Sequence, residues 1–276
     1  MGRAGHSDVM GGVPLSASAI GLEGQVTVVD GAKKPFETPK AMSIAEIETT
    51  IEDYGNAAAN AIAAGFDGVQ VHGANGYLVD QFIQSCSNVR VDEYGGSLEN
   101  RLRFLKRVLE ATTAAAGPER TWIRLSPNGA FQSMGSADNL ETFDAAIQMA
   151  AGFKVGCVEV MDGLSFGFHK KTEPYTLERV RKNVNIGNAD RTSPTAVMGN
   201  VGHTQESANR EIGAGNADLI SIGRSYMSNP DLPERFRDGV PLAAVPAQAD
   251  WWKKQGADGY TSFPRATKKD VSTSNY

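Results

Sequence analysis

The sequence predicts an α/β fold of the barrel class, in which helices cover a parallel sheet. The first observation is that short apolar segments alternate along the chain with amphipathic segments, which is the pattern of repeated strand–helix units. The second is size, because 276 residues with 41% hydrophobic content are enough for one barrel domain with a sizeable core. No internal repeat or low-complexity segment interrupts the pattern.

The elements follow in regular order after an excursion rich in Gly and Pro at residues 1–42. Ser43 and Glu46 have the spacing of a capping box, so a helix is expected to begin there and to run to about residue 64. Strands are expected at 66–72, 121–126, 155–161, 195–199 and 218–224. Helices are expected at 98–116, 139–153, 175–183 and 204–213, with another beginning near residue 231.

Five strands are too few for a closed barrel, which needs eight. We therefore expect a single barrel domain over residues 1–276 that holds about five of eight strand–helix units. These units lie within residues 43–240, between the excursion and a C-terminal tail at 241–276. The missing units are expected to be N-terminal, so the sequence is interpreted as a partial gene product or an incomplete sequence.

Composition excludes several classes of partner. A net charge of −5, with 27 basic and 32 acidic residues interspersed, gives no surface of one sign that binds nucleic acid or anionic lipid. Cys86 and Cys157 have no metal-ligand spacing, which predicts free thiols in a reducing compartment and no metal. The first residues lack the apolar core of a signal peptide, and no apolar run reaches the ~20 residues that span a bilayer. A cytoplasmic protein without a membrane partner is expected.

Strand alternation predicts which side chains point into the barrel, because residues two apart share a face. Gln70 and His72 are expected inside, with the intervening valine outside. The same pattern places Arg124 inside. A charged group inside a barrel is costly unless it is paired, so Arg124 needs either an anionic or carbonyl ligand or an interior acid such as Glu159. Both interpretations stay open on the pattern alone.

Two strand ends predict a phosphate site. Gly199 and Asn200 end the penultimate strand, and Gly223 and Arg224 end the last one, which is where barrels commonly bind phosphate. Glycines let backbone N–H groups approach phosphate oxygens, and an arginine can bind them with two hydrogen bonds. The alternative is that these glycines are only turn residues.

One long motif carries a family resemblance. The segment HGANGYLVDQF at 72–82 resembles the Old Yellow Enzyme family of FMN-dependent ene-reductases, as do NVR at 88–90 and DEYGGSLENR at 92–101. The resemblance continues through 124–127, 161–169, 199–200 and 223–231 and ends near 259–260, so it covers nearly the whole chain. It implies a (β/α)8 barrel, noncovalent FMN, NADPH or NADH as reductant, and α,β-unsaturated carbonyl substrates.

The resemblance also implies roles for individual residues. His72 and Asn75 match the two donors that hold the substrate carbonyl oxygen over the flavin, and Tyr77 matches the proton donor. Arg124 matches the residue beside flavin N1 and O2. The phosphate cradle is matched by Gly199, Asn200, Gly223 and Arg224. The alternative is that His72 is a hydrogen-bonded structural histidine and Tyr77 a residue that packs a loop.

The chain also departs from the family pattern. In the family, the first barrel strand and a Gln and Trp near the end of the third strand contact the flavin ring, and these have no counterpart here. Met1 to Arg3 match the end of that third strand. The second hypothesis is therefore a truncated, non-catalytic fragment or pseudoenzyme that acts as a binding or assembly module. A homo-oligomer is left open. A barrel aldolase or lyase lacks support, because no suitably placed lysine or metal cluster is found.

Overall fold

The computed structural model of the chain describes residues 1–189, 194–251 and 256–267. The chain divides into two compact units. Unit 1 contains residues 1–202 and 210–220, and unit 2 contains residues 203–209 and the described residues from 221 onward. None of the described helices is both long enough and apolar enough to cross a bilayer.

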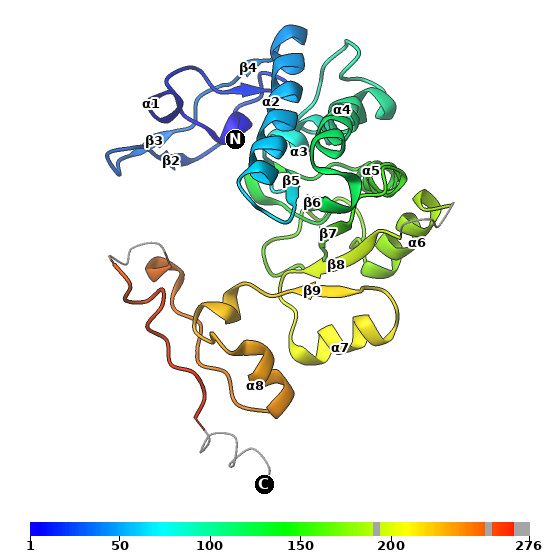
Figure 1. Cartoon of the computed structure of the whole chain (residues 1–276). Helices are drawn as coiled ribbons and strands as arrows, with labels where there is room; N and C mark the ends of the chain where they lie inside the picture. The colour runs from blue at the N-terminus through cyan, green and yellow to red at the C-terminus, as the bar shows by residue number, and fades with distance from the viewer. Residues whose placement is uncertain (190–193, 252–255, 268–276) are drawn as a thin grey trace. The chain divides into compact units, whose positions relative to one another are not determined.

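Unit 1 is built on one five-stranded sheet, whose strands lie side by side in chain order (Figure 1). The strands are β5 (Val69–Gly73), β6 (Thr121–Leu125), β7 (Cys157–Met161), β8 (Ala196–Asn200) and β9 (Leu219–Ser221). The pairings from β5 to β8 are parallel. This is the arrangement that consecutive strand–helix units produce, and it confirms the α/β prediction.

Helices follow the strands as predicted, with two additions. The helices are α1 (Ser7–Met10), α2 (Ile44–Ala63), α3 (Leu78–Ile83), α4 (Leu98–Ala116), α5 (Asn139–Gly152), α6 (Leu177–Gly187), α7 (Gln205–Gly213) and α8 (Leu232–Asp238). The short 3-10 helices are η1 (Gly2–Ala4), η2 (Pro118–Arg120), η3 (Phe131–Ser133), η4 (Arg224–Met227) and η5 (Gln248–Asp250). The capping box is confirmed, since Ser43 Oγ accepts from Glu46 N at 3.3 Å and the Glu46 carboxylate accepts from Ser43 N at 2.7 Å. The helices α1 and α3 were not predicted from the sequence.

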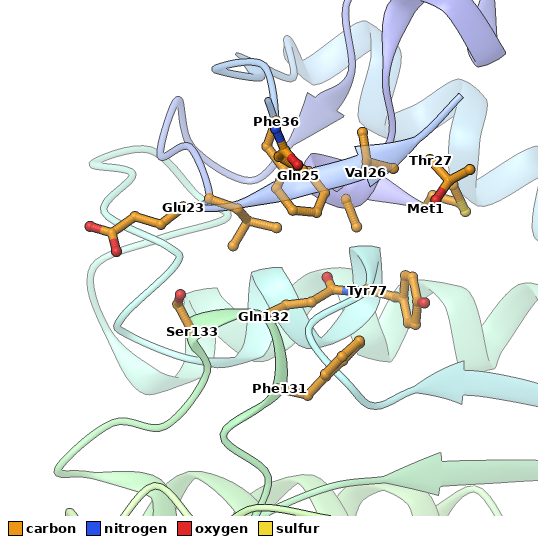
Figure 2. Close-up of a pocket in the computed structure, with 12 residues that line it drawn as sticks. Met1, Glu23, Gln25, Val26, Thr27, Phe36, Tyr77, Phe131, Gln132 and Ser133 are labelled. Atoms are coloured by element: carbon orange, nitrogen blue, oxygen red, sulfur yellow. The ribbon is translucent and has the colours of Figure 1, made fainter. Parts of the chain in front are cut away.

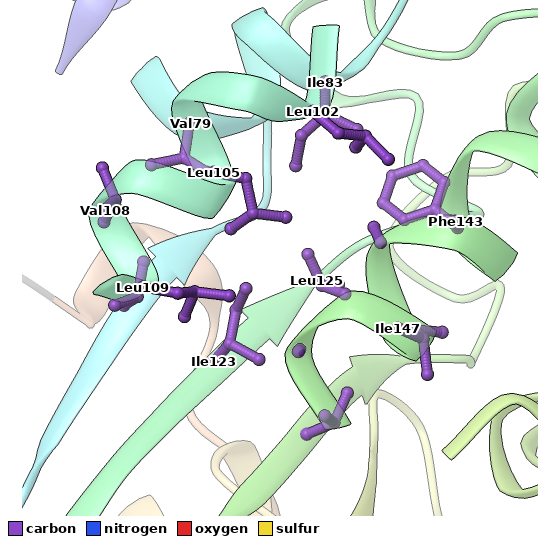
Figure 3. Packing of buried hydrophobic residues seen from close by; sticks show 14 of the residues in the cluster. Val79, Ile83, Leu102, Leu105, Val108, Leu109, Ile123, Leu125, Phe143 and Ile147 are labelled. Atoms are coloured by element: carbon purple, nitrogen blue, oxygen red, sulfur yellow. The ribbon is translucent and has the colours of Figure 1, made fainter. Parts of the chain in front are cut away.

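The core lies between one face of the sheet and the helices. Ile123 and Leu125 of β6 have no exposed surface and pack among apolar side chains of α3, α4 and α5 (Figure 3). Val71 occupies the same face of β5. Burial of each such side chain stabilises the folded state by about 1.5–3 kcal/mol. The predicted outward direction of these residues is confirmed, and we call the opposite face, which carries Arg124, the inner face.

The excursion at 1–42 is more ordered than predicted. It contains the antiparallel hairpin of β2 (Gln25–Thr27) and β3 (Lys33–Pro35), and a short parallel pair of β1 (Leu15–Ser16) and β4 (Lys40–Ala41). Gly31 at the hairpin tip has φ +82°, a backbone conformation that suits glycine. These strands have two or three residues each and no apolar alternation, so the periodicity did not reveal them.

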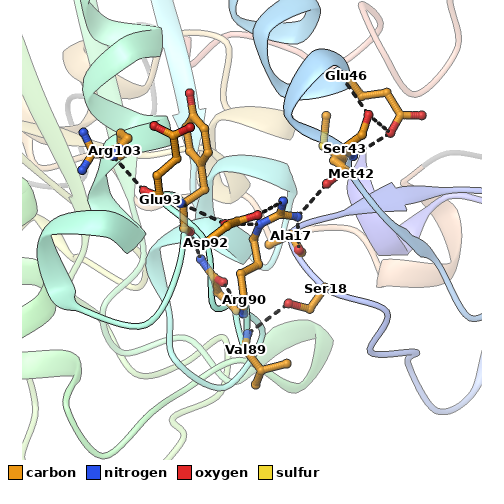
Figure 4. A network of polar contacts seen from close by, with 12 residues as sticks. Ala17, Ser18, Met42, Ser43, Glu46, Val89, Arg90, Asp92, Glu93 and Arg103 are labelled. Atoms are coloured by element: carbon orange, nitrogen blue, oxygen red, sulfur yellow. Dashed lines mark hydrogen bonds and ion pairs between the residues drawn. The ribbon is translucent and has the colours of Figure 1, made fainter.

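Arg90 fastens the excursion to the loop after α3 (Figure 4). Its Nη1 donates to the carbonyl oxygens of Ala17 at 2.9 Å and Met42 at 2.7 Å. Its Nε and Nη2 bind the Asp92 carboxylate at 3.0 and 2.6 Å. The Arg90 side chain is only 8% exposed, so these charge-assisted bonds are poorly screened. The motif residue Arg90 therefore has a structural role.

Three predicted elements differ from the structure by three or four residues at one end. The first strand begins at Val69 rather than at Phe66, because Phe66 closes the turn after α2 through its N–H bond to the Ala61 carbonyl at 3.1 Å. The last strand ends at Ser221, and Arg224 opens η4 instead of belonging to the strand. The helix predicted at 175–183 runs from Leu177 to Gly187, since the Thr176 side chain caps its start.

Unit 2 holds the described part of the predicted tail around α8. Arg235 of α8 binds the Asp231 carboxylate with its Nε at 2.8 Å. Its two terminal nitrogens donate to the carbonyl oxygens of Pro241 at 2.9 Å and Pro264 at 3.2 Å. Arg235 is buried, and it fastens two points of the segment after α8 to that helix.

Candidate active site

Polar side chains from four neighbouring strands meet on the inner face of the sheet. Gln70 Nε2 donates to Glu159 Oε2 at 2.8 Å, and Arg124 Nη2 donates to Asn200 Oδ1 at 2.6 Å. Arg124 and Glu159 are direct neighbours in the register of β6 and β7. The inward direction predicted for Gln70 and Arg124 is therefore confirmed.

Arg124 is paired with Glu159 but keeps an unused donor. Its Nε lies 3.2 Å from Glu159 Oε1, which makes an ion pair. This contact is not a hydrogen bond, so Nε is a buried donor without a hydrogen-bond partner. The interpretation of Arg124 as paired with an interior acid is therefore confirmed, while its binding of a ligand acceptor stays a prediction.

His72, Asn75 and Tyr77 lie along one short connection between β5 and α3. His72 is near the carboxyl end of β5, and Tyr77 is the residue that precedes the first turn of α3. The two rings lie 5.2 Å apart between centroids and are tilted by 45°. Asn75 adopts φ +59°, a left-handed conformation that is uncommon outside glycine and that turns the chain between the two rings. The structure therefore brings His72 and Tyr77 together.

A buried acid holds this connection in place. Asp80 Oδ2 accepts from Gly76 N at 2.8 Å, and Gln81 Nε2 donates to the Gly76 carbonyl at 2.5 Å. Asn75 N donates to Ser126 Oγ at 2.8 Å. Burial raises the pKa of Asp80 to about 6, against the opposing effect of its hydrogen bonds. Sequence reasoning missed Asp80, although an acid inside the apolar run LVDQF is a signal for such a role.

The electrostatics around His72 favour its neutral form. Burial, followed by the positive charge of Arg124, lowers the pKa of His72 from its usual value. A neutral imidazole still offers one N–H donor. Asn75 Oδ1 is buried and has no hydrogen-bond partner, which is rare in folded proteins and leaves an acceptor open to a donor.

A pocket of about 500 Å³ opens beside Tyr77 (Figure 2). One wall is formed by Tyr77 and the turn from Phe131 to Ser133, and the opposite wall by the β2–β3 hairpin with Phe36. Among the described site residues of unit 1 that the sequence predicted, Tyr77 alone lines it. The hairpin wall was not predicted, because those strands gave no sequence signal.

The turn from Phe131 to Ser133 has an unusual backbone. Gln132 and Ser133 have φ of +55° and +57°, which costs free energy for residues other than glycine. The buried Arg3 supports this turn, since its Nη2 donates to the Gln132 carbonyl at 2.9 Å. Phe131 also contacts Phe166, with ring centroids 5.6 Å apart. The fixed turn holds Phe131 at the pocket.

The residues of unit 1 that the sequence predicts to bind phosphate also have structural contacts. A Cβ on Gly199 would lie 2.8 Å from the terminal side-chain carbons of Leu177 and Ile220, so a larger residue there would displace these side chains. The N–H of Asn200 donates to Asp162 Oδ1 at 2.9 Å. Phosphate binding by Gly199 and Asn200 therefore stays a prediction.

The other two residues that the sequence predicts to bind phosphate belong to unit 2. Gly223 and Arg224 are both exposed, and a Cβ on Gly223 would meet no atom within 4 Å. The Arg224 guanidinium lies 5.4 Å from the centroid of the Trp251 ring, a cation–π contact. The role of Arg224 also stays a prediction.

Comparisons with known proteins identify the family of the chain. Residues 14–243 match the NADH:flavin oxidoreductase / NADH oxidase family. The chain is 33% identical to 12-oxophytodienoate reductase 7 of Oryza sativa subsp. japonica, over 96% of this chain and 69% of that protein. It is 34% identical to the chanoclavine-I aldehyde reductase of Penicillium roqueforti, over 91% of this chain and 68% of the other.

Solved structures give the same result. The Old Yellow Enzyme homologue of Zymomonas mobilis is similar with a TM-score of 0.85 at 37% identity, over 96% of this chain and 71% of that one. Morphinone reductase in complex with tetrahydroNAD is similar with a TM-score of 0.84 at 30% identity, over 97% and 71%. The chain thus spans about 70% of the length of these relatives.

Fold and comparisons define an FMN-dependent oxidoreductase of the (β/α)8-barrel class, of which this chain holds five strand–helix units. The chain belongs to the NADH:flavin oxidoreductase / NADH oxidase family, and within it to the Old Yellow Enzymes. It is an enzyme that uses FMN and NAD(P)H to reduce the C=C bond of α,β-unsaturated carbonyl compounds.

Proposed function

We propose that His72 and Asn75 bind the carbonyl oxygen of the enone and that Tyr77 supplies the proton to its α-carbon. Bound FMN, once reduced by NAD(P)H, supplies the hydride to the β-carbon. The observation that carries this assignment is the placement of His72 and Tyr77, whose rings lie 5.2 Å apart across one connection. Asn75 lies between them in the chain, and its Nδ2 amide group is the donor that can bind a carbonyl oxygen.

The residues on the inner face fit the cofactor. Arg124 has a buried Nε without a hydrogen-bond partner, and this donor suits an acceptor such as flavin N1 or O2. We propose that Arg124 binds there, where its charge stabilises negative charge on the ring. We also propose, on the sequence resemblance, that Gly199, Asn200, Gly223 and Arg224 contribute to phosphate binding. The exposed guanidinium of Arg224 is suited to bidentate binding of a phosphate.

The protonation states fit the proposed chemistry. Hydride addition to the β-carbon builds negative charge on the carbonyl oxygen, and donors already in place there are most useful in a poorly solvated site. His72 has a lowered pKa, so it donates as a neutral imidazole and adds no second positive charge beside Arg124. A phenol at Tyr77 then acts as general acid, a contribution of typically ~10²- to 10⁴-fold.

The pocket beside Tyr77 supports a small substrate. Its volume of about 500 Å³ lies in the range of ~300–1,000 Å³ that is common for small-molecule sites. Val26 and Phe36 from the hairpin side and Phe131 from the opposite wall give it apolar surface. We propose that the enone skeleton lies here. The presence of His72, Asn75 and Tyr77 supports an enzyme over the non-catalytic module.

The experiment that tests this function follows the colour of the flavin. The FMN-loaded protein is mixed without oxygen with NADPH or with NADH, and bleaching of the flavin band gives the preferred reductant. Addition of 2-cyclohexenone then restores the oxidised spectrum and yields cyclohexanone. Added cyclohexanone is the matched control, because it has no C=C bond and leaves the flavin reduced. Recovery of colour with oxygen but not with the enone contradicts the proposal and indicates an NAD(P)H oxidase.

A further inference from the structure

Glu159 is an acidic residue on the inner face, and it has no role in the reaction proposed above. Along the described strands β5 to β8, it is the one acid whose side chain points to that face. Its side chain is 8% exposed, against 24% for Arg124 beside it. A carboxylate in such a position is costly unless it is paired, so its presence requires a reason.

The contacts of Glu159 connect it to the proposed flavin site. Gln70 fixes one carboxylate oxygen, with Nε2 donating to Oε2 at 2.8 Å. The other oxygen, Oε1, lies 3.2 Å from Arg124 Nε. Arg124 Nη2 donates to Asn200 Oδ1 at 2.6 Å. Arg124 is thus held between an acid and an amide, and its direction depends on both.

We propose that Glu159 positions Arg124 and offsets its charge, and so lowers the reduction potential of the bound FMN. The inference rests on the proposed placement of flavin N1 and O2 beside Arg124. Two-electron reduction of the flavin places negative charge at N1, which the guanidinium stabilises. The carboxylate 3.2 Å from the same guanidinium opposes this stabilisation, and its burial limits screening by water and salt.

The consequence for catalysis is a balance between the two half-reactions. Arg124 alone would make FMN easier to reduce by NAD(P)H but a weaker hydride donor to the enone. Glu159 shifts this balance toward the donor side. Because Glu159 acts through Arg124, we describe it as a positioning residue rather than a catalytic one.

The test measures the flavin potential in Glu159→Gln, which keeps the shape of the side chain and an acceptor for Gln70. We expect the equilibrium constant for two-electron reduction to rise about tenfold, which is a shift of about 30 mV to a more positive potential. Sulfite adds to oxidised flavin and leaves negative charge at N1, so its affinity should rise about tenfold as well. Glu141→Gln removes the same charge from an exposed position on α5 and should leave both values unchanged.

A second background separates positioning from a direct effect of charge. In a protein that already carries Arg124→Gln, adding Glu159→Gln should change the equilibrium constant for flavin reduction by less than about twofold. The reason is that the residue through which Glu159 acts is gone. A shift as large as in the wild type contradicts the positioning role. Should Glu159→Gln fail to fold, Glu159→Asp, which moves the charge away from Arg124, should raise the potential by a smaller amount.

The outcomes also separate this inference from the proposed function. A wild-type protein that holds FMN and turns over the enone, with an unchanged potential and sulfite affinity in both Glu159 variants, contradicts the inference alone. A wild-type protein that holds FMN but does not reduce the enone contradicts the proposed function. In that case a raised potential in Glu159→Gln still supports the role of Glu159.

Discussion

Asp80 accepts the backbone N–H of Gly76 at 2.8 Å, so an acid with no exposed surface holds the connection that carries Asn75 and Tyr77. Its second oxygen accepts from Gln84 Nε2 at 2.8 Å. Asp80 is in the first turn of α3, and the connection is therefore fixed to that helix. Precise placement of donors is what the proposed reaction requires, since small displacements of reacting groups reduce rates strongly.

The first prediction concerns the pH dependence of stability. Burial raises the pKa of Asp80 from 3.8 to about 6, so the folded protein binds this proton more tightly than the unfolded chain does. The resulting stabilisation is fully present below pH 3.8 and is lost as the pH rises through about 6. Asp80→Asn removes this dependence. Between pH 4 and 7, the free energy of unfolding of the wild type should fall by about 2–3 kcal/mol relative to the variant.

Chemical denaturation at several pH values measures this difference. Asp80 accepts hydrogen bonds with both carboxylate oxygens, and an Asn side chain has only one acceptor oxygen. This loss changes the stability of Asp80→Asn at every pH, so the two proteins are compared by how their stability changes with pH. Parallel pH profiles for the wild type and Asp80→Asn contradict the raised pKa. Asp53→Asn, an exposed position on α2, is the matched control and should follow the wild type.

The second prediction tests the oxygen-binding pair. Replacing both His72 and Asn75 by Ala should weaken the binding of phenolic ligands, because their oxygen is expected to occupy the same position as the proposed carbonyl oxygen. Each hydrogen bond to a charged oxygen contributes about 1.5–3 kcal/mol, so the loss in affinity should be at least tenfold. Absorbance titration of the flavin band gives the dissociation constant. Asn60→Ala, at an exposed position of α2, is the control, and unchanged phenol affinity in the double variant refutes the assignment.

The third prediction concerns Arg224. Arg224→Ala should weaken FMN far more than riboflavin, because the residue is proposed to bind the phosphate that riboflavin lacks. Fluorescence quenching titrations with both flavins measure the two affinities. Arg237→Ala is the control within the same unit, since this exposed arginine pairs with Asp238. If both flavins lose affinity equally in Arg224→Ala, the residue supports the fold instead.

The fourth prediction concerns the excursion. Arg90→Ala removes two bonds to backbone carbonyls of Ala17 and Met42 and leaves the Asp92 carboxylate without its arginine. We expect a loss of about 3 kcal/mol in the free energy of unfolding. Limited proteolysis should then cut within residues 1–42 faster than in the wild type. Arg103→Ala, which loses a more exposed bond to the Glu93 carbonyl, should have a clearly smaller effect on both measurements. Equal effects of the two variants argue against the fastening role of Arg90.

The sequence predicted the elements whose signals are local. The bounds of α4 agree with the prediction, because Ser97 caps its start and Gly117 with φ +88° ends it. The inner direction of Arg124 followed from alternation with buried Ile123 and Leu125. Such signals depend on neighbours in the chain, so one sequence is enough to read them.

Other features depend on contacts between distant residues, and the sequence could not predict them. The β2–β3 hairpin forms a wall of the pocket, but its strands are largely exposed and show no periodic pattern. The fixing of the Asn75 backbone by Ser126 joins residues that are 51 positions apart. The pairing of Arg124 with Glu159 was one of two open interpretations, and only the register of β6 and β7 established it.

The most direct test of the account is the replacement Tyr77→Phe, studied in the two half-reactions by stopped-flow absorbance. Tyr77 is proposed to donate a proton only after hydride transfer to the enone, so reduction of the flavin by NADPH should remain nearly unchanged. Oxidation of the reduced flavin by 2-cyclohexenone should slow by about 10²-fold or more. An equal slowing of both half-reactions, or no slowing of either, contradicts the role of Tyr77 as proton donor and with it the proposed site.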